Sequence, residues 1–286
     1  MSVVLGRYDS SASTSTIAHW DAVCGAPSGT TRHYLSIQDN WDGSFTKFSY
    51  SNDRVPIIAV HSWTDNPRHG IAWQDVADGA WDTTILSHAQ ALKALPGRNV
   101  PAYLVFHHEP ENEEDGHVSG DLPAGETCGT RDQFKAAFEH FRALVRTVLD
   151  PTDALIGCTL MAGSFRSGRW ADWVPSRYQF LGVDGYSRGD PKSTFAYCCA
   201  AAHDAAVATT KKLLIEEVGC SEIIGTNFKA DFITEIRDTC KTWPELLAIS
   251  YSNTVAKEDY TLDTSGASLA AWQAMAGDAS YIGPWT

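Results

Sequence analysis

The sequence lacks the short motifs that mark several large enzyme classes. It has no Gly-x-Ser-x-Gly turn, no phosphate-binding glycine loop, no dinucleotide-binding glycine fingerprint and no His-Glu-x-x-His pair. These absences disfavour a serine esterase, an NTPase, a Rossmann-type dehydrogenase and a zincin protease. Internal repeats and low-complexity segments are absent as well.

Positive charge is scarce. The 286 residues include 22 Lys and Arg against 35 Asp and Glu, which gives a formal net charge of −13. Nucleic acids and anionic membranes bind basic surfaces, so this balance argues against both as partners. It also disfavours a highly anionic substrate, unless a local basic patch overrides the global sign.

Long apolar runs are missing too. None approaches the roughly 20 residues that a membrane-spanning helix needs. The first ten residues, MSVVLGRYDS, contain no basic region, long apolar stretch or small-residue cleavage site, and they do not read as a secretory signal. We therefore expect a soluble chain without a visible signal peptide, whose location is open.

The seven cysteines form no recognisable framework. They are Cys24, Cys128, Cys158, Cys198, Cys199, Cys220 and Cys240. Their odd number leaves at least one unpaired within the chain, and their spacing matches no zinc-binding pattern. A chain of this length does not depend on disulfides, so buried or scattered thiols are expected.

Eight short apolar runs, rich in β-branched residues, recur along the chain. They span residues 3–8, 33–38, 55–62, 100–107, 154–161, 180–186, 212–219 and 246–252. Most are almost continuously apolar, which is typical of parallel strands buried on both faces.

Helical periodicity lies between most of these runs. It is clearest over 131–149, where Phe134, Phe138, Phe141, Val145 and Val148 share one face. Further helices are predicted over 13–23, 81–95, 193–211, 229–242 and 268–276. Strands alternating with helices, and no linker, favour one (β/α)8 TIM barrel that forms a single domain over residues 1–286. A doubly wound open sheet is the main alternative.

Active sites of such barrels lie at the carboxyl ends of the strands. The polar residues found there are Tyr8-Asp9, Gln38-Asp39-Asn40-Trp41, His61-Ser62-Trp63, His107-His108-Glu109-Pro110-Glu111, Asp184-Gly185-Tyr186-Ser187, Glu216-Glu217 and Tyr251-Ser252-Asn253. Carboxylates follow the fourth and the seventh strand. Glycoside hydrolysis uses such a pair, and a separation of roughly 5–5.5 Å is the retaining geometry.

Two segments of the sequence resemble the catalytic strands of a known enzyme family. VPAYLVFHHEPEN, followed later by KLLIEEVG, resembles the catalytic strands of a clan A glycoside hydrolase, most closely glycoside hydrolase family 26, the β-mannanase-like family. The VDGY run after the sixth strand extends the likeness. The chain departs from the family in reading His-Glu-Pro-Glu-Asn without a nearby Trp, and in carrying Tyr251 where a Trp is common.

The resemblance implies a role for each matching residue. Glu109 would be the acid/base and Glu217 the nucleophile. His108 would shape the pocket of Glu109, Tyr186 would orient Glu217, and Asp184 would support its loop. Because Glu109 must start protonated, we expect burial and the charge of Glu217 to raise its pKa.

Each assignment has a rival. Glu111 is the alternative acid and Glu216 the alternative nucleophile. Adjacent strand residues point to opposite faces, so we expect only one of Glu216 and Glu217 to face the barrel axis. Asp39, Trp41, Trp63, His61 and Tyr251 are candidate substrate contacts, because aromatic faces stack on sugar rings.

The segment 109–126 holds seven acidic residues and no Lys or Arg, which predicts a solvated acidic loop beside the cleft. We therefore expect neutral or cationic glycans to be preferred over uronic-acid polymers.

The sequence thus predicts a retaining endo-glycoside hydrolase acting on a neutral, extracellular polysaccharide, β-mannan-like or a bacterial wall glycan. No cofactor or metal is implied, and the oligomeric state is open. One alternative is a non-catalytic carbohydrate-binding or structural module of a larger surface or phage tail assembly. Another is a metal-dependent barrel hydrolase with His61, His107, His108 and Asp184 as ligands.

Overall fold

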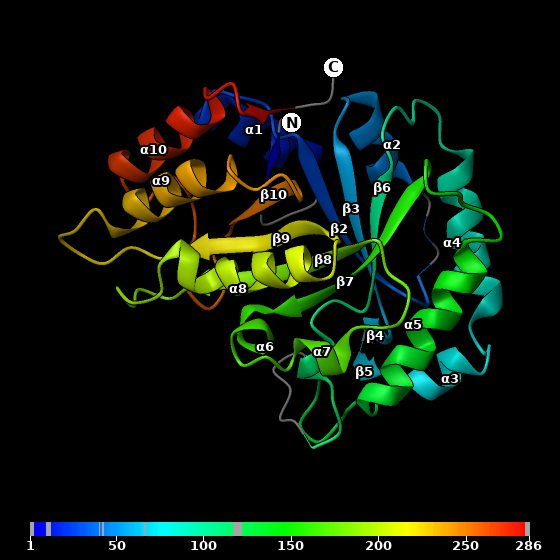
Figure 1. Ribbon diagram of the computed structural model, residues 1–286. Helices are drawn as coiled ribbons and strands as arrows, with labels where there is room; N and C mark the ends of the chain where they lie inside the picture. Colours follow the sequence, from blue (N-terminus) through cyan, green and yellow to red (C-terminus); the bar gives the residue numbers. More distant parts are fainter. Residues whose placement is uncertain are drawn as a thin grey trace.

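The computed structural model describes residues 3–9, 13–39, 41, 43–65, 67–116 and 122–283. Its centre is a curled sheet of nine parallel strands in the order β11-β1-β10-β9-β8-β7-β6-β3-β2 (Figure 1). The strands are β1 (Val3–Asp9), β2 (Thr30–Ser36), β3 (Val55–His61), β6 (Ala102–Phe106), β7 (Ala154–Met161), β8 (Phe180–Ser187), β9 (Lys212–Cys220), β10 (Leu246–Asn253) and β11 (Tyr281–Ile282).

Helices cover the outer face of this sheet (Figure 1). They are α1 (Thr14–Cys24), α2 (Ser44–Ser51), α3 (Trp73–Ala77), α4 (Asp82–Ala94), α5 (Arg131–Val145), α6 (Ala162–Arg166), α7 (Trp170–Trp173), α8 (Phe195–Ala208), α9 (Phe228–Cys240) and α10 (Gly266–Ala276). A hairpin of β4 (Trp63–Asp65) and β5 (Arg68–Gly70) follows β3, and a 3₁₀ turn spans Pro110–Asn112.

All eight predicted strands and the six predicted helices are present. The second strand begins at Thr30, three residues before the predicted start. The hairpin β4–β5 and the short helix α3 were not expected, because strands of three residues and a helix of five are too short to show a period.

The two ends of the long sheet come together at β1 and β2. No ladder joins these strands within the described residues, but the Gly29 N–H donates to the Leu5 carbonyl at 2.8 Å. A Cβ on Gly6 would lie 1.8 Å from Thr30 Oγ1, so only glycine permits this approach. The rings of Tyr8 and Tyr34 also meet, with centroids 5.7 Å apart. The carboxyl ends of β1 and β2 therefore share one rim.

Helix α5 shows how the outer layer fixes the strand ends. Thr130 caps it, because the Thr130 N–H donates to Gln133 Oε1 at 2.8 Å and Thr130 Oγ1 accepts from the Gln133 N–H. Phe134, Phe138 and Phe141 are buried, and Phe141 packs on Phe106 at the end of β6 with centroids 5.1 Å apart. This packing holds the strand that leads into His107 and Glu109.

Two further predictions concern the whole chain. All seven cysteines are buried and form no disulfide, as expected. Among the described residues, none of the helices has both the length and the apolar character needed to cross a membrane.

Candidate active site

The turn after β6 holds Glu109 in an unusual backbone conformation. His107 and Glu109 are non-glycine residues in the left-handed region, with φ of 49° and 51°. Such conformations cost on the order of 1–3 kcal/mol each and persist only where the surroundings enforce them. Here the His107 N–H donates to the Val60 carbonyl at 2.8 Å, and the Glu109 N–H donates to the Thr159 carbonyl at 3.2 Å. Asn112 Nδ2 then donates to Glu109 Oε2 at 2.9 Å.

His107 anchors this turn from inside the protein. Its Nδ1 accepts from the Ser62 N–H at 3.2 Å, which leaves the proton on Nε2, 3.2 Å from Glu113 Oε2. Trp73 packs edge-on against the imidazole with centroids 5.2 Å apart. Since His107 is fully buried, its imidazole supports the turn and does not face the cleft.

Strand β9 carries a β-bulge at the paired glutamates. Against β8, Ile215 pairs with Val183, but the next pair is Glu217 with Asp184, so β9 has one extra residue there. The pairing with β10 shows the same extra residue between Ile215 and Val218. The expectation that only one of Glu216 and Glu217 can point inward is wrong, because the bulge breaks the two-residue alternation and both carboxylates reach Arg32.

Arg32 of β2 is a fully buried cation beneath the strand ends. Its Nη2 lies 3.0 Å from Glu216 Oε1 and 3.3 Å from His108 Nδ1, and its Nη1 donates to the Glu216 carbonyl at 3.1 Å. Nη1 also forms an ion pair with Glu217 Oε1. Arginine suits this position because its planar, always charged guanidinium can bridge several acceptors. The sequence reasoning missed Arg32, because the predicted strand began at residue 33 and the observed one begins at Thr30.

Two tyrosine hydroxyls complete the surroundings of Glu217. Tyr34 of β2 donates to Glu217 Oε1 and Tyr186 of β8 donates to Oε2. Tyr186 was a predicted neighbour, whereas Tyr34 was missed. Gly219 pairs with Tyr186, and a Cβ there would lie 2.9 Å from the Tyr186 ring. The glycine in the Glu-Val-Gly run therefore lets Tyr186 approach the carboxylate.

The two candidate catalytic carboxyls have opposite electrostatic environments. Burial raises the pKa of Glu109 well above its usual value, and the nearby Asp184 and Glu217 raise it further against the opposing effect of His108. Burial also acts to raise the pKa of Glu217, but Arg32, His108 and the two tyrosine hydrogen bonds outweigh it and lower that pKa to about 2. Near neutral pH, this environment favours a proton on Glu109 and a charge on Glu217.

His108 and Asp184 lie beside this pair. Asp184 Oδ2 is 2.7 Å from His108 Nδ1. Burial, together with Glu217 and Glu216, raises the pKa of Asp184 well above its usual value. One nitrogen of His108 and one oxygen each of Glu109 and Asp184 lie within 4.8 Å of one another, so these three side chains could hold a cation. A cation bound through Nδ1 would have to displace the contacts of that atom with Asp184 and Arg32.

Two cavities flank the carboxyls. One, here the β2 cavity, has about 290 Å³ and is lined by Tyr34, Leu35, Ser36, His61, Trp63, Arg68 and His108. The other, the β8 cavity, has about 310 Å³ and is lined by Glu109, Met161, Ala162, Gly163, Arg166, Asp184, Tyr186, Arg188, Asp190 and Ser193. His61 stacks on Trp63 with centroids 3.8 Å apart, and burial lowers the pKa of His61 well below its usual value. The first cavity thus presents uncharged rings beside Arg68.

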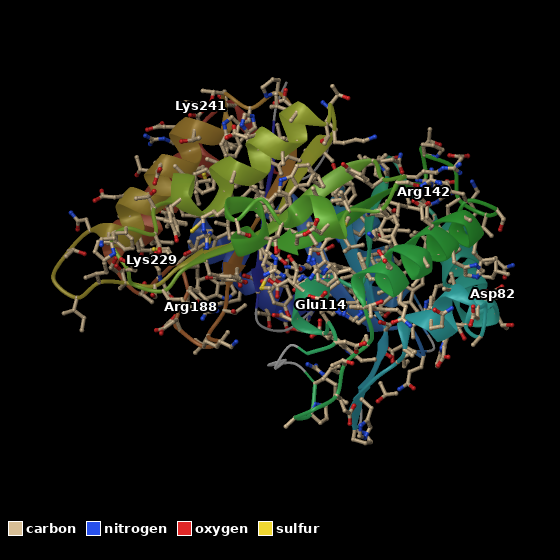
Figure 2. All side chains as sticks on the ribbon, turned by 60° about the horizontal axis from the view of Figure 1, so that its bottom comes forward. Asp82, Glu114, Arg142, Arg188, Lys229 and Lys241 are labelled. Atoms are coloured by element: carbon tan, nitrogen blue, oxygen red, sulfur yellow. The ribbon has the colours of Figure 1, made fainter. Side chains whose placement is uncertain are left out.

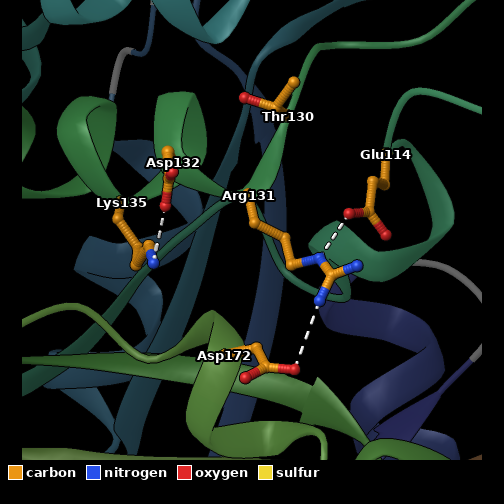
Figure 3. A pocket seen from close by; sticks show the side chains of 6 residues that line it. All are labelled: Glu114, Thr130, Arg131, Asp132, Lys135 and Asp172. Carbon is orange, nitrogen blue, oxygen red and sulfur yellow. Dashed lines mark hydrogen bonds and ion pairs between the residues drawn. The ribbon is translucent and has the colours of Figure 1, made fainter.

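A larger hollow of about 430 Å³ lies away from these carboxyls, between the start of α5 and α7 (Figure 3). Its charged side chains form ion pairs with one another. Arg131 contacts Glu114, and its Nη1 lies 3.2 Å from Asp172, while Lys135 Nζ lies 2.8 Å from Asp132. Because these ion pairs engage its charged side chains, we do not assign it catalysis.

Several predicted contacts lie apart from both cavities. Trp41 is buried against His88, with centroids 6.3 Å apart. Asp39 Oδ2 accepts from the Ser36 N–H at 2.7 Å and so closes its own turn. Tyr251 is fully buried and its hydroxyl donates to the Cys220 carbonyl at 3.4 Å. Glu111 is buried as well, with Oε1 accepting from the Met161 N–H at 3.0 Å, and burial raises its pKa to about 7.

In the described part of segment 109–126, two acids are buried, whereas the composition predicts a solvated loop. Glu111 and Glu113 are only 5% and 1% exposed. Glu113 faces His107, Glu114 pairs with Arg131, and Glu126 lies 2.7 Å from His69 Nδ1. Asp121 lies outside the described residues. The composition of the segment gives the number of acidic residues, but it does not show which of them are buried or paired.

No protein-family model and no curated protein sequence matches the chain. Solved structures do. A family 26 β-mannanase from Bacteroides ovatus has a TM-score of 0.71 at 15% identity, covering 99% of this chain and 90% of that one. A modular endo-β-1,4-mannanase from Cellulomonas fimi has a TM-score of 0.68 at 14% identity, covering 99% and 72%. A fungal β-1,4-galactanase has a TM-score of 0.60 at 11% identity, covering 88% and 89%. The likeness is one of fold, and that fold is the one of family 26 β-mannanases.

Proposed function

We propose that this chain is a retaining endo-glycoside hydrolase acting on a β-linked polysaccharide, built as a single (β/α)8 catalytic domain. The proposal rests mainly on one observation: on the same rim, the surroundings raise the pKa of Glu109 and lower the pKa of Glu217. A retaining glycosidase needs one protonated and one ionised carboxyl beside the scissile bond. The fold shared with family 26 mannanases supports the same conclusion.

The reaction would proceed in two steps. Glu217 attacks the anomeric carbon, while Glu109 gives its proton to the glycosidic oxygen, so that the bond to the leaving sugar breaks and a glycosyl ester on Glu217 forms. Glu109, now ionised, takes a proton from a water that attacks the same carbon and releases Glu217. Tyr34 and Tyr186 would hold the Glu217 oxygens in place, and Arg32 would keep Glu217 ionised before attack.

The two cavities then take different halves of the substrate. Because Glu109 lines the β8 cavity, that cavity would hold the leaving sugar, which receives the proton. The β2 cavity, with Tyr34, His61 and Trp63, would hold the sugar that is attacked. The uncharged rings that line this cavity suit an uncharged sugar there.

Release of reducing sugar tests the activity. Purified protein is incubated with β-mannan first, then with β-galactan, mixed-linkage glucan, xylan and bacterial wall glycan. We expect Glu109→Gln and Glu217→Gln each to lose at least about a thousandfold in kcat/KM. Glu111→Gln is the matched control, because Glu111 is a buried neighbour bonded to backbone, and it should retain most activity. Full activity of either Glu109→Gln or Glu217→Gln would disprove the assignment.

Stereochemistry and chelation test the mechanism. Proton NMR of the first product should show the anomer of the substrate, and inversion would rule out the double displacement. Activity that survives exhaustive EDTA treatment would exclude a required cation at His108, Glu109 and Asp184. Glycan binding without turnover on any polymer would favour the non-catalytic module instead.

A further inference from the structure

We propose that the β8 cavity binds an acidic sugar, whose anionic substituent is held by Arg166 and Arg188. This inference rests on the proposed function for its placement, since the β8 cavity is the leaving-group side. It defines the substrate class more narrowly: a heteroglycan in which an acidic residue follows the neutral sugar that is attacked.

The two arginines enter the cavity from different elements. Arg166 ends α6, and Arg188 directly follows β8; both line the cavity and both are exposed. In the view of Figure 2, Arg188 lies between Lys229 and Glu114. Two guanidiniums on one cavity of about 310 Å³ provide paired donors suited to a carboxylate or sulfate.

Neither arginine is neutralised by the protein. Within the described part of the chain, neither forms an ion pair with a carboxylate, although other arginines, such as Arg7, Arg54 and Arg98, do. Aromatic rings position them instead. The Arg166 guanidinium lies 4.3 Å from the centre of the Tyr197 ring, and Arg188 hydrogen-bonds to Tyr260. Rings hold a guanidinium without cancelling its charge.

The carboxyl groups of the cavity offset this charge only in part. Asp190, whose Oδ1 accepts from the Lys192 backbone N–H at 3.0 Å, is one exposed carboxylate beside the two guanidiniums. Burial raises the pKa values of Glu109 and Asp184 well above their usual range. Among the other charged lining residues, two guanidiniums face one carboxylate.

Part of the acidic segment that argued against anionic substrates is also compensated. Glu114 is paired with Arg131, and Glu113 is buried against His107. The net charge of −13 thus says little about the cleft. A local basic patch overrides the global sign on the leaving-group side.

A binding experiment tests the inference without requiring turnover. Methyl β-glucuronide and methyl β-glucoside differ only in the carboxylate, and methyl β-glucoside 6-sulfate supplies the other anion. Each is titrated into the wild-type protein while the side-chain Nε–H signals of arginine are followed by NMR. We expect the anionic glycosides, but not the glucoside, to shift the Arg166 and Arg188 signals; whichever anion binds at least tenfold more tightly identifies the substituent.

Charge-removing variants decide whether these residues carry the effect. Arg166→Gln and Arg188→Gln should each weaken binding of the anionic glycoside about tenfold, whereas Arg177→Gln, an exposed arginine that lines neither cavity, should not. Equal binding of glucuronide and glucoside by the wild type, or unchanged binding in the Arg166→Gln/Arg188→Gln double variant, would overturn the inference.

A hydrolysis experiment separates this inference from the proposed function. The substrates are gellan and hyaluronan, each compared with its own carboxyl-reduced form, which has the same linkages without the charge. Cleavage of the acidic form at least tenfold faster supports the inference, and equal or faster cleavage of the reduced form refutes it while leaving the glycosidase intact. Glucuronide binding at Arg166 and Arg188 without cleavage of any glycan supports the inference and refutes the proposed function.

Discussion

Replacing Arg32 should move the acidic limb of the pH–activity profile. The surroundings of Glu217 lower its pKa from 4.5 to about 2. At about 1.4 kcal/mol per pH unit, this is about 3 kcal/mol in favour of the ionised nucleophile. Arg32 opposes burial more than any other group does. In Arg32→Met the burial remains and the charge is gone, so the pKa of Glu217 should rise to near or above 4.5.

The direction of the activity change follows from the required charge. Glu217 must be ionised to attack, so activity is present above its pKa and is lost as the pH falls through it. The wild-type kcat/KM should therefore persist as the pH falls to about 3. In the variant it should decline below about pH 5. The alkaline limb, set by loss of the Glu109 proton, should remain above the usual glutamate range in both proteins.

Stability must be separated from this effect. Arg32→Met also leaves the fully buried Glu216 without its cation, which costs about 3–5 kcal/mol and could unfold the protein. The double variant Arg32→Met/Glu216→Gln removes the stranded charge, and Glu216→Gln alone is its matched control. Profiles of kcat/KM against pH are compared for these two proteins after circular dichroism has shown both to be folded. Coincident acidic limbs would refute the role given to Arg32.

Three further predictions concern the site and its support. Tyr34→Phe removes one hydrogen bond to the charged Glu217, so kcat/KM should fall about tenfold and the acidic limb should move up, whereas an unchanged limb would contradict the contact. Trp63→Ala should raise KM by at least about fivefold with a smaller change in kcat, and a pure kcat defect would contradict a binding role. Phe134→Ala opens a cavity under α5, and chemical denaturation should show a loss of about 3–5 kcal/mol in the free energy of unfolding; a loss below 1 kcal/mol would contradict its packing role.

The strands and their polar ends could be predicted because burial on both faces leaves a plain trace in sequence. The run Ala154–Met161 is nearly continuous in apolar residues, and it forms β7 with the predicted bounds. Parallel strands that share a direction bring their carboxyl ends to one rim, so placing Glu109 and Glu217 together needed no knowledge of contacts. The contact of Tyr186 with Glu217 was implied by the family resemblance instead.

Arg32 and the β9 bulge could not be predicted by that logic. Arg32 lies in β2 before the apolar residues from which the strand was predicted. Its role depends on contacts with His108 and Glu216, which are 76 and 184 positions away in sequence. The bulge depends on how β9 pairs with both neighbours, and a two-residue period assumes that no such insertion occurs. Trp41 is buried, because a Trp near a strand end can equally pack inward, and this too has no trace in the sequence.

The net charge was also a poor guide to the site, because it does not show which charged side chains are buried or paired. A chain with a net negative charge can still place cations beside its candidate active site. Ion pairing determines which charges contribute to the local electrostatic potential. In segment 109–126, for example, Glu111 and Glu113 are buried and Glu114 is paired with Arg131. Arg32 beneath the rim lowers the pKa of Glu217, whereas burial raises the pKa of Glu109. The proposed division of these two side chains into a nucleophile and an acid therefore depends on one buried guanidinium.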